Sequence, residues 1–167
     1  MKWMLLLTGA FSFFGCMAQT EGSAVLYGYV QTVSPGAPPR NIDEGMTDAK
    51  TQSGKNYFIY IEADTRVYPA AIWIEGVAYS PRMRTIASTP VTKTNANVPA
   101  AAPIVLVPQT SRKVLQLIPA PTIESKNTEE AASLARDHEL VVLYKMNGKF
   151  YYNTLTKLER LPVAARQ

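Results

Sequence analysis

The sequence predicts an all-β protein, or a β-rich one with a single short helix, built as an antiparallel β-sandwich or a small barrel. Three observations predict this class. Short runs rich in valine, isoleucine and tyrosine recur along the chain, and clusters of glycine, proline or asparagine separate them. Only one stretch has the spacing of apolar residues that is typical of an amphipathic helix. Strands and helices do not alternate, so the pattern does not favour a parallel α/β sheet.

The first 18 residues predict a secretory signal peptide, which leaves residues 19–167 as a single β-rich domain. Lys2 supplies a positive start, an almost wholly apolar stretch follows it, and small residues end it. That stretch is shorter than the roughly 20 apolar residues of a spanning helix. Two processing routes are open: cleavage after Ala18, or acylation of Cys16 within a segment that resembles a degenerate lipobox. The expected location is the periplasm or the outer membrane, with an anchor at Cys16 in the second case.

The folded part begins with a predicted strand over residues 24–33, which is rich in valine and tyrosine. Gly28 inside this strand indicates a bulge or a close backbone approach. A long polar loop is expected over residues 34–55, because the segment lacks any periodicity. Residues 57–63 then predict a second strand with strongly β-forming side chains.

The middle of the chain predicts further short strands, with Gly76 as a bulge in the first of them and proline at several ends. These strands cover residues 70–79, with an extension over 82–87 after Pro81, and residues 104–107 and 114–118. Prolines bracket the last two, and since proline cannot donate to a ladder we expect these two near a sheet edge. A second long loop, rich in threonine, asparagine and proline, is expected over residues 88–101.

One helix is predicted over residues 128–137. Asn127 is a good N-cap, and Glu130 follows it three residues later, as in a capping box. A single helical stripe contains Ala131, Leu134, Ala135 and His138.

The clearest local signal is Asn147-Gly148, which lies between strand-like runs at residues 140–146 and 149–155. Such a dipeptide favours a two-residue type I′ turn and so predicts a C-terminal β-hairpin of known register. The predicted partners are Met146 and Lys149, Tyr144 and Tyr151, Leu143 and Tyr152, and Val141 and Thr154. Both faces are largely apolar, so either the hairpin is buried on both sides or one face is an exposed aromatic surface.

Composition argues against several chemistries. The net charge is +4 and the basic residues are scattered, which does not favour a nucleic-acid interface. Cys16 is the only cysteine and His138 the only histidine, so the sequence excludes a zinc site of several cysteines or histidines, and also an intramolecular disulfide. No glycine-rich phosphate-binding motif is present. We therefore expect no cofactor and no metal site.

Catalytic arrangements are weakly supported. His138 is the only available base for a serine triad, and its neighbour Asp137 does not face it on a helix. The carboxylates Glu62, Asp64 and Glu75 satisfy the residue types of a glycosidase pair, but solvated strand ends explain them more simply. A small hydrolase that uses His138 or Glu75 is the weakest of three functional hypotheses.

The tyrosine-rich strands provide the other two hypotheses. Tyrosine and tryptophan combine apolar area with a polar group and so suit binding surfaces, although packing is their default role in strands. The candidate surface contains Tyr144, Tyr151, Trp73 and Tyr79. The leading hypothesis is a non-enzymatic, exported module of the cell envelope, an accessory subunit that contacts a protein partner. The alternative is a carbohydrate- or peptidoglycan-binding module that stacks sugars on the same aromatic residues.

Overall fold

The structure, a computed structural model, describes residues 24–34, 54–94, 102–121 and 129–165. The predicted signal peptide with Cys16, most of the predicted 34–55 loop and the predicted N-cap Asn127 lie outside these ranges. The strands are β1 (Val25–Ser34), β2 (Gly54–Ala63), β3 (Val67–Ile74), β4 (Val77–Thr85), β5 (Val91–Lys93), β6 (Ile104–Val107), β7 (Lys113–Pro121), β8 (Leu140–Met146), β9 (Lys149–Leu155) and β10 (Glu159–Ala165). The helix is α1 (Glu129–Asp137). These elements confirm the predicted β-rich class with one short helix.

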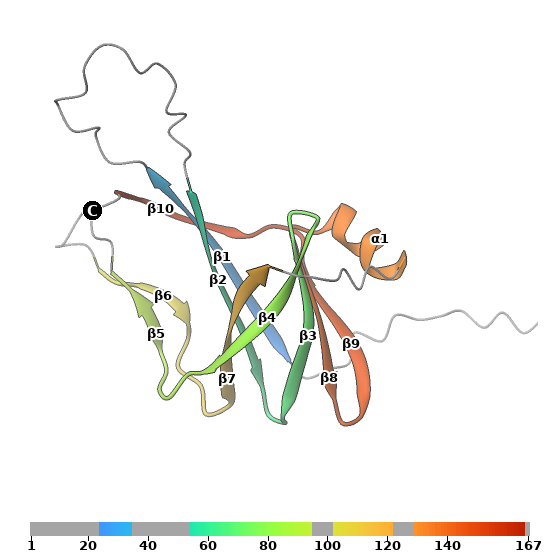
Figure 1. The fold of residues 1–167 in the computed structure, drawn as a ribbon. Helices are drawn as coiled ribbons and strands as arrows, with labels where there is room; N and C mark the ends of the chain where they lie inside the picture. Colours follow the sequence, from blue (N-terminus) through green and yellow to red (C-terminus); the bar gives the residue numbers. More distant parts are fainter. Residues whose placement is uncertain (1–23, 35–53, 95–101, 122–128, 166–167) are drawn as a thin grey trace, which may run out of the picture.

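Eight strands form one sheet in the order β10-β1-β2-β7-β4-β3-β8-β9, while β5 and β6 form a separate two-stranded ribbon. Neighbouring strands of the large sheet are antiparallel, except that β10 runs parallel to β1. The sheet curls strongly into a half-barrel (Figure 1), since strand twist accumulates across so many strands. Of the two architectures that the sequence predicts, the structure is therefore closer to the barrel than to two packed sheets.

The curl brings the C-terminal strands against β1 at Gly28. A Cβ atom added to Gly28 would lie 2.7 Å from a δ-carbon of Leu158 and 2.8 Å from δ-carbons of both Leu140 and Leu155. The side-chain amide of Asn153 in β9 also donates a hydrogen bond of 2.9 Å to the carbonyl of Ala24. The close contacts at Gly28 are made by leucine side chains rather than by another backbone segment, and they let distant parts of the sheet pack together.

The concave face of the sheet holds the main core. Its members come from β1, β2, β3, β7 and β8, together with Leu158 after β9. The largest buried side chains there include Ile59, Ile61, Ile72, Leu117, Leu140 and Tyr144. At one end of this core, the Lys55 ammonium lies 2.6 Å from a carboxylate oxygen of Glu75, which links the start of β2 to the turn after β3.

The convex face is covered in two places. The β5–β6 ribbon packs Leu106 and Val107 on Tyr29, Tyr60 and Val114. Helix α1 packs Ala131, with Leu134 and Ala135 beside it, on Trp73 and Val141 of β3 and β8. The predicted helix and its apolar stripe are therefore confirmed, although the stripe is short because the helix has only nine residues.

The hairpin register predicted around Asn147-Gly148 is confirmed in all four partner pairs. The single strand predicted over residues 70–79 is wrong, because Glu75 and Gly76 form a second tight turn between β3 and β4. Both turns have the same backbone, with φ of 50° at Glu75 and Asn147 and of 82° at Gly76 and Gly148. Glutamate seldom takes positive φ, so Glu75-Gly76 did not indicate the turn as Asn-Gly does.

The structure differs from the strand and loop predictions at four further places. Strand β7 lies between β2 and β4 inside the sheet, not near an edge. Its prolines are tolerated because Pro119 lies beyond Leu117, the last β7 residue that pairs with β2. Its partner Pro81 likewise lies beyond Tyr79, the last β4 residue that pairs with β3. The predicted 88–101 loop contains β5, and residues 54 and 55 of the predicted first loop belong to β2. Strand β10 was not predicted at all; its parallel partner β1 lies at the other end of the described chain.

Candidate functional site

The predicted aromatic surface is not a surface in the structure. Tyr144 has 1% of its area exposed and Trp73 has 2%. Tyr144 points into the concave core with the other core residues of β8. Trp73 lies on the opposite side of the sheet, beneath helix α1. In the structure the core covers Tyr144 and helix α1 covers Trp73, so neither side chain is exposed at the predicted surface.

The other two residues of that prediction, Tyr151 and Tyr79, are half-buried against the same core. Tyr151 stacks on Tyr144 with ring centroids 5.9 Å apart and an angle of 25° between the rings. Burial raises the pKa of the Tyr144 hydroxyl above its ordinary value, and the neighbouring Tyr151 raises it further. Tyr79 belongs to β4, two strands away from β8 in the sheet order, so the four residues do not form one site.

The exposed aromatic side chains of this part of the sheet are different ones. Tyr68 of β3 pairs with Lys145 of β8, which pairs with Phe150 of β9, so the three share the convex face. Tyr68 is 47% exposed and Phe150 is 63% exposed. The Arg66 guanidinium lies 4.9 Å from the Tyr68 ring centre, and the Lys145 ammonium lies 5.9 Å from that of Phe150. We call these four residues the aromatic row.

Beside the aromatic row, the sheet opens between β3 and β4. The ladder of these strands contains three residue pairs, Ile72–Ile74 with Val77–Tyr79, and beyond it the strands diverge (Figure 1). A cavity of about 440 Å³ lies where they have separated. It is lined by Thr65, Arg66, Val67, Tyr68, Met83, Thr85, Lys113 and Leu115. We call this opening, with these lining residues, the wedge.

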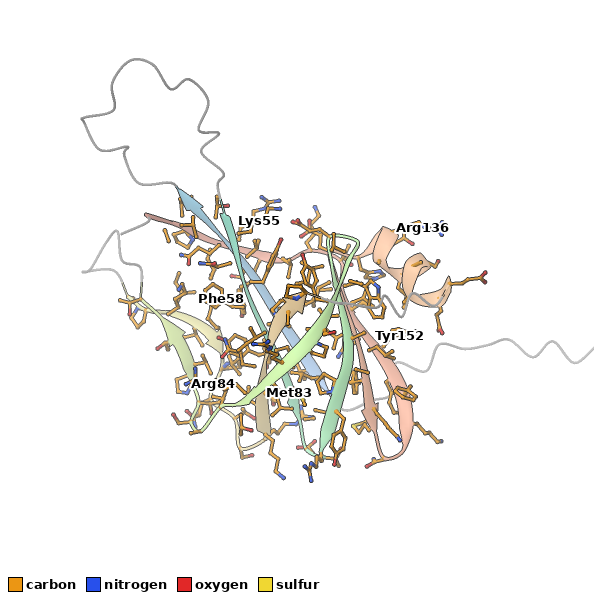
Figure 2. All side chains as sticks on the ribbon, viewed as in Figure 1. Lys55, Phe58, Met83, Arg84, Arg136 and Tyr152 are labelled. Carbon is orange, nitrogen blue, oxygen red and sulfur yellow. The ribbon has the colours of Figure 1, made fainter. Side chains whose placement is uncertain are left out.

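Met83 shows that the wedge leads to the interior of the half-barrel. It pairs with Leu117 of β7, and Leu117 pairs with Ile59 of β2, so the three share the core face of the sheet. Leu117 and Ile59 are almost completely buried, whereas Met83 is 51% exposed. Figure 2 labels Met83 on the side of β4 that faces β3, and β3 does not pair with Met83. A core-facing side chain with this exposure marks an open place in the core.

The wedge combines an apolar wall with a basic rim. Val67, Met83 and Leu115 supply apolar side chains, while Arg66 and Lys113 add positive charge. The nearby carboxylates are already engaged, since Arg112 pairs with Glu62 and Asp64. The ion pairs found among the described residues do not include Arg66 or Lys113. Both basic groups are therefore available to a ligand with negative charge.

The carboxylates considered for catalysis have structural partners. Glu62 is buried, and it accepts hydrogen bonds from the hydroxyls of Tyr27 at 2.7 Å and of Thr110 at 2.9 Å. Burial and the hydrogen bond to Glu62 raise the pKa of Tyr27 to about 12. The hydrogen bond from Arg112 to Asp64 raises the pKa of that guanidinium. This network ties the segment before β7 to β2.

The remaining catalytic candidates, Glu75 and His138, lie in neighbouring segments, since the backbone N–H of Glu75 donates a 2.8 Å hydrogen bond to the carbonyl of Glu139, but each side chain has its own partners. Glu75 is in the β3–β4 turn, where it binds Lys55 and accepts a 3.3 Å hydrogen bond from Tyr57. Burial, together with the charge of Glu75, raises the pKa of the Tyr57 hydroxyl to about 12. The His138 Nδ1 atom lies 3.0 Å from the carbonyl oxygen of Leu134 at the end of helix α1. In the described ranges, no three His, Cys, Asp or Glu side chains are grouped as metal ligands.

Comparison with known proteins gives no lead, since no family model, curated protein or solved structure matches the chain. In the part of the chain that the structure describes, no helix has the length and apolar character needed to cross a membrane. The site must therefore be judged on its own geometry. The sequence did not indicate that Tyr68 and Met83 are exposed. For Phe150 it contained one signal: the residue lies beside the Asn147-Gly148 turn, at the end of the hairpin, where side chains are often exposed.

Proposed function

We propose that the protein is a non-enzymatic, exported binding module of the cell envelope, an accessory subunit that contacts a protein partner. The observation that carries the proposal is the aromatic row, in which two large aromatic side chains remain exposed beside two cations. An isolated exposed apolar residue needs no explanation, but Tyr68 and Phe150 lie in one row across three strands, and Tyr68 also lines the wedge.

The composition of this region supports a protein partner. Aromatic residues, methionine and arginine are enriched in protein interfaces, and the region contains Tyr68, Phe150, Met83 and Arg66. The backbone of these residues belongs to the β-sheet or to the segment just before β3, so binding orders little additional main chain. Export is supported by the signal-like pattern of residues 1–18, and an exported module meets its partners outside the cytoplasm.

The test is co-purification from detergent-solubilised envelopes of the source cells, with the tagged full chain as bait. Phe150→Ala is expected to lower recovery of the partner by about tenfold or more, as for a residue at the centre of an interface. Val105→Ala is the matched control, because Val105 is a similarly exposed apolar residue on the separate β5–β6 ribbon. Equal recovery with both variants, or no protein above background, would contradict the proposal.

A second candidate function is the binding of a glycan. The exposed rings of Tyr68 and Phe150 favour it, since sugar rings stack on flat aromatic faces. Sedimentation of the protein with purified peptidoglycan separates the two candidates. Binding that Phe150→Ala abolishes and that needs no other protein would favour the glycan.

A further inference from the structure

We infer that the wedge accepts an extended segment of an acidic protein partner, which adds to β4 as a new strand and inserts an apolar side chain toward the core. This inference rests on the proposed function, since it specifies how a protein partner is held. It is carried by three features of the wedge: the direction of the β4 peptide groups, the apolar wall and the basic rim.

Pro81 reveals the direction of the β4 peptide groups. It pairs with Pro119 of β7, and neither proline has an N–H to donate. This pair must therefore be of the non-hydrogen-bonded kind, in which both residues direct their peptide groups away from each other. The pattern repeats every second residue, so Met83 and Thr85 also direct their N–H and C=O groups away from β7 and toward β3.

Across the wedge, β3 does not reach these groups. Its pairing with β4 ends at Ile72 and Tyr79, and none of the pairs includes Met83 or Thr85. Pro69 of β3 pairs with Tyr144 of β8, and by the same argument its nitrogen faces the wedge. The β4 side of the wedge is thus a free strand edge inside the sheet, and free edges are templates for an added strand.

The side chains around that edge define the chemistry of the added strand. Successive residues of a strand point to opposite faces, so one side chain enters the core side while its neighbours face outward. Val67 and Leu115 offer an apolar contact on the core side. Arg66 and Lys113 favour a carboxylate at the rim. The cavity of about 440 Å³ falls within the range of about 300–1,000 Å³ of ordinary binding pockets.

The experiment selects short peptides from a random display library against the purified full-length protein, and then measures the affinity of selected synthetic peptides. Selected peptides are expected to contain an apolar residue next to aspartate or glutamate. Their binding should weaken as salt is added, because the rim charges are solvent-accessible. N-methylation of alternate peptide nitrogens should reduce affinity by about tenfold or more, since it removes the ladder donors without touching the side chains.

Variants of the protein give the reciprocal test. Met83→Pro removes one N–H that faces the wedge and leaves the β7 ladder intact, so it should abolish peptide binding. Met83→Leu keeps both that N–H and an apolar side chain, and should bind like the original protein. Thermal unfolding verifies that Met83→Pro is folded; if it is not, the N-methylated peptides on the unaltered protein decide. Lys113→Gln should weaken binding of acidic peptides only.

Two results would overturn the inference: selection of no peptide or of peptides without carboxylates, and equal affinity of N-methylated and unmodified peptides. Each is distinguishable from failure of the proposed function. If Phe150→Ala abolishes capture of an envelope protein while Met83→Pro leaves that capture unchanged, the partner binds at the aromatic row and strand addition is wrong. If peptides bind as expected but the envelope contains no partner, the wedge binds extended segments and the envelope assignment is wrong.

Discussion

Replacing Gly28 by alanine tests how the curled sheet closes on itself. The added methyl group would lie 2.7–2.8 Å from δ-carbons of Leu140, Leu155 and Leu158, closer than carbon atoms normally approach. Leu140 and Leu158 are buried, so their side chains have little space in which to move away. Overpacking of this kind costs about 1–3 kcal/mol. For a chain of this length, each kcal/mol lowers the melting temperature by roughly 2–4 °C.

Gly54→Ala is the matched control. A Cβ at Gly54 meets nothing within 4 Å, so this variant keeps the general effect of the exchange and lacks the collision. Exchanging glycine for alanine lowers the conformational entropy of the unfolded chain, and this stabilises the folded state by about 0.4–1 kcal/mol. The difference in unfolding free energy between the two variants, measured by urea denaturation, therefore isolates the steric cost. A difference below about 0.5 kcal/mol would refute the idea that the three leucines close the half-barrel against β1.

Three further predictions concern single side chains. The unfolding free energy should fall as the pH rises from about 10 to about 12, because Tyr27 and Tyr57 ionise in the unfolded chain at a lower pH than in the folded protein. Denaturation curves measured across this range test it, and an unfolding free energy that does not change with pH would contradict it. Glu62→Gln should lower the pKa of Tyr27 toward its ordinary value, since the carboxylate contributes to its rise, and ultraviolet titration would measure this. The same variant should lose about 1–3 kcal/mol of unfolding free energy in denaturation experiments. Tyr144→Ala should cost about 3–5 kcal/mol of stability, whereas Phe150→Ala should cost less than about 0.5 kcal/mol; similar losses would mean that their burial has been misassigned.

The parts of the fold that the sequence predicted depend on neighbours in the chain. The Asn147-Gly148 turn determines which residues of β8 and β9 face each other, because a two-residue turn allows only one register. Helix α1 was predicted from the spacing of its apolar residues, which its packing on Trp73 requires. In both cases the information lies within a few residues of the element that it specifies.

The parts that the sequence did not predict depend on distant pairing. Strand β10 exists because β1 offers it an edge, and nothing near residues 159–165 indicates that edge. The hairpin has two apolar faces, and the sequence does not say which one the curled sheet will enclose. The structure encloses the face with Tyr144 and leaves Phe150 of the other face beyond the reach of helix α1. Of the predicted binding surface, Tyr144 and Tyr151 therefore lie on the enclosed face of the hairpin.

The same dependence on pairing explains why the wedge exists. Strands β3 and β4 leave a tight turn whose backbone matches that of the β8–β9 turn, yet β8 and β9 stay paired along their whole length while β3 and β4 separate after three pairs. The difference lies in two prolines. Pro69 of β3 and Pro81 of β4 each have no N–H group to direct into the wedge. If the β3–β4 ladder continued past Ile72 and Tyr79, carbonyl groups of the opposite strand would therefore have no donor to pair with. Beyond Pro81, Met83 again has a donor on that side, but β3 has by then separated from β4, while it stays paired with β8 from Val67 to Ile74. Proline thus holds the strands apart at the narrow end of the wedge, and the donors that remain at its wide end can be satisfied by water or by an added strand.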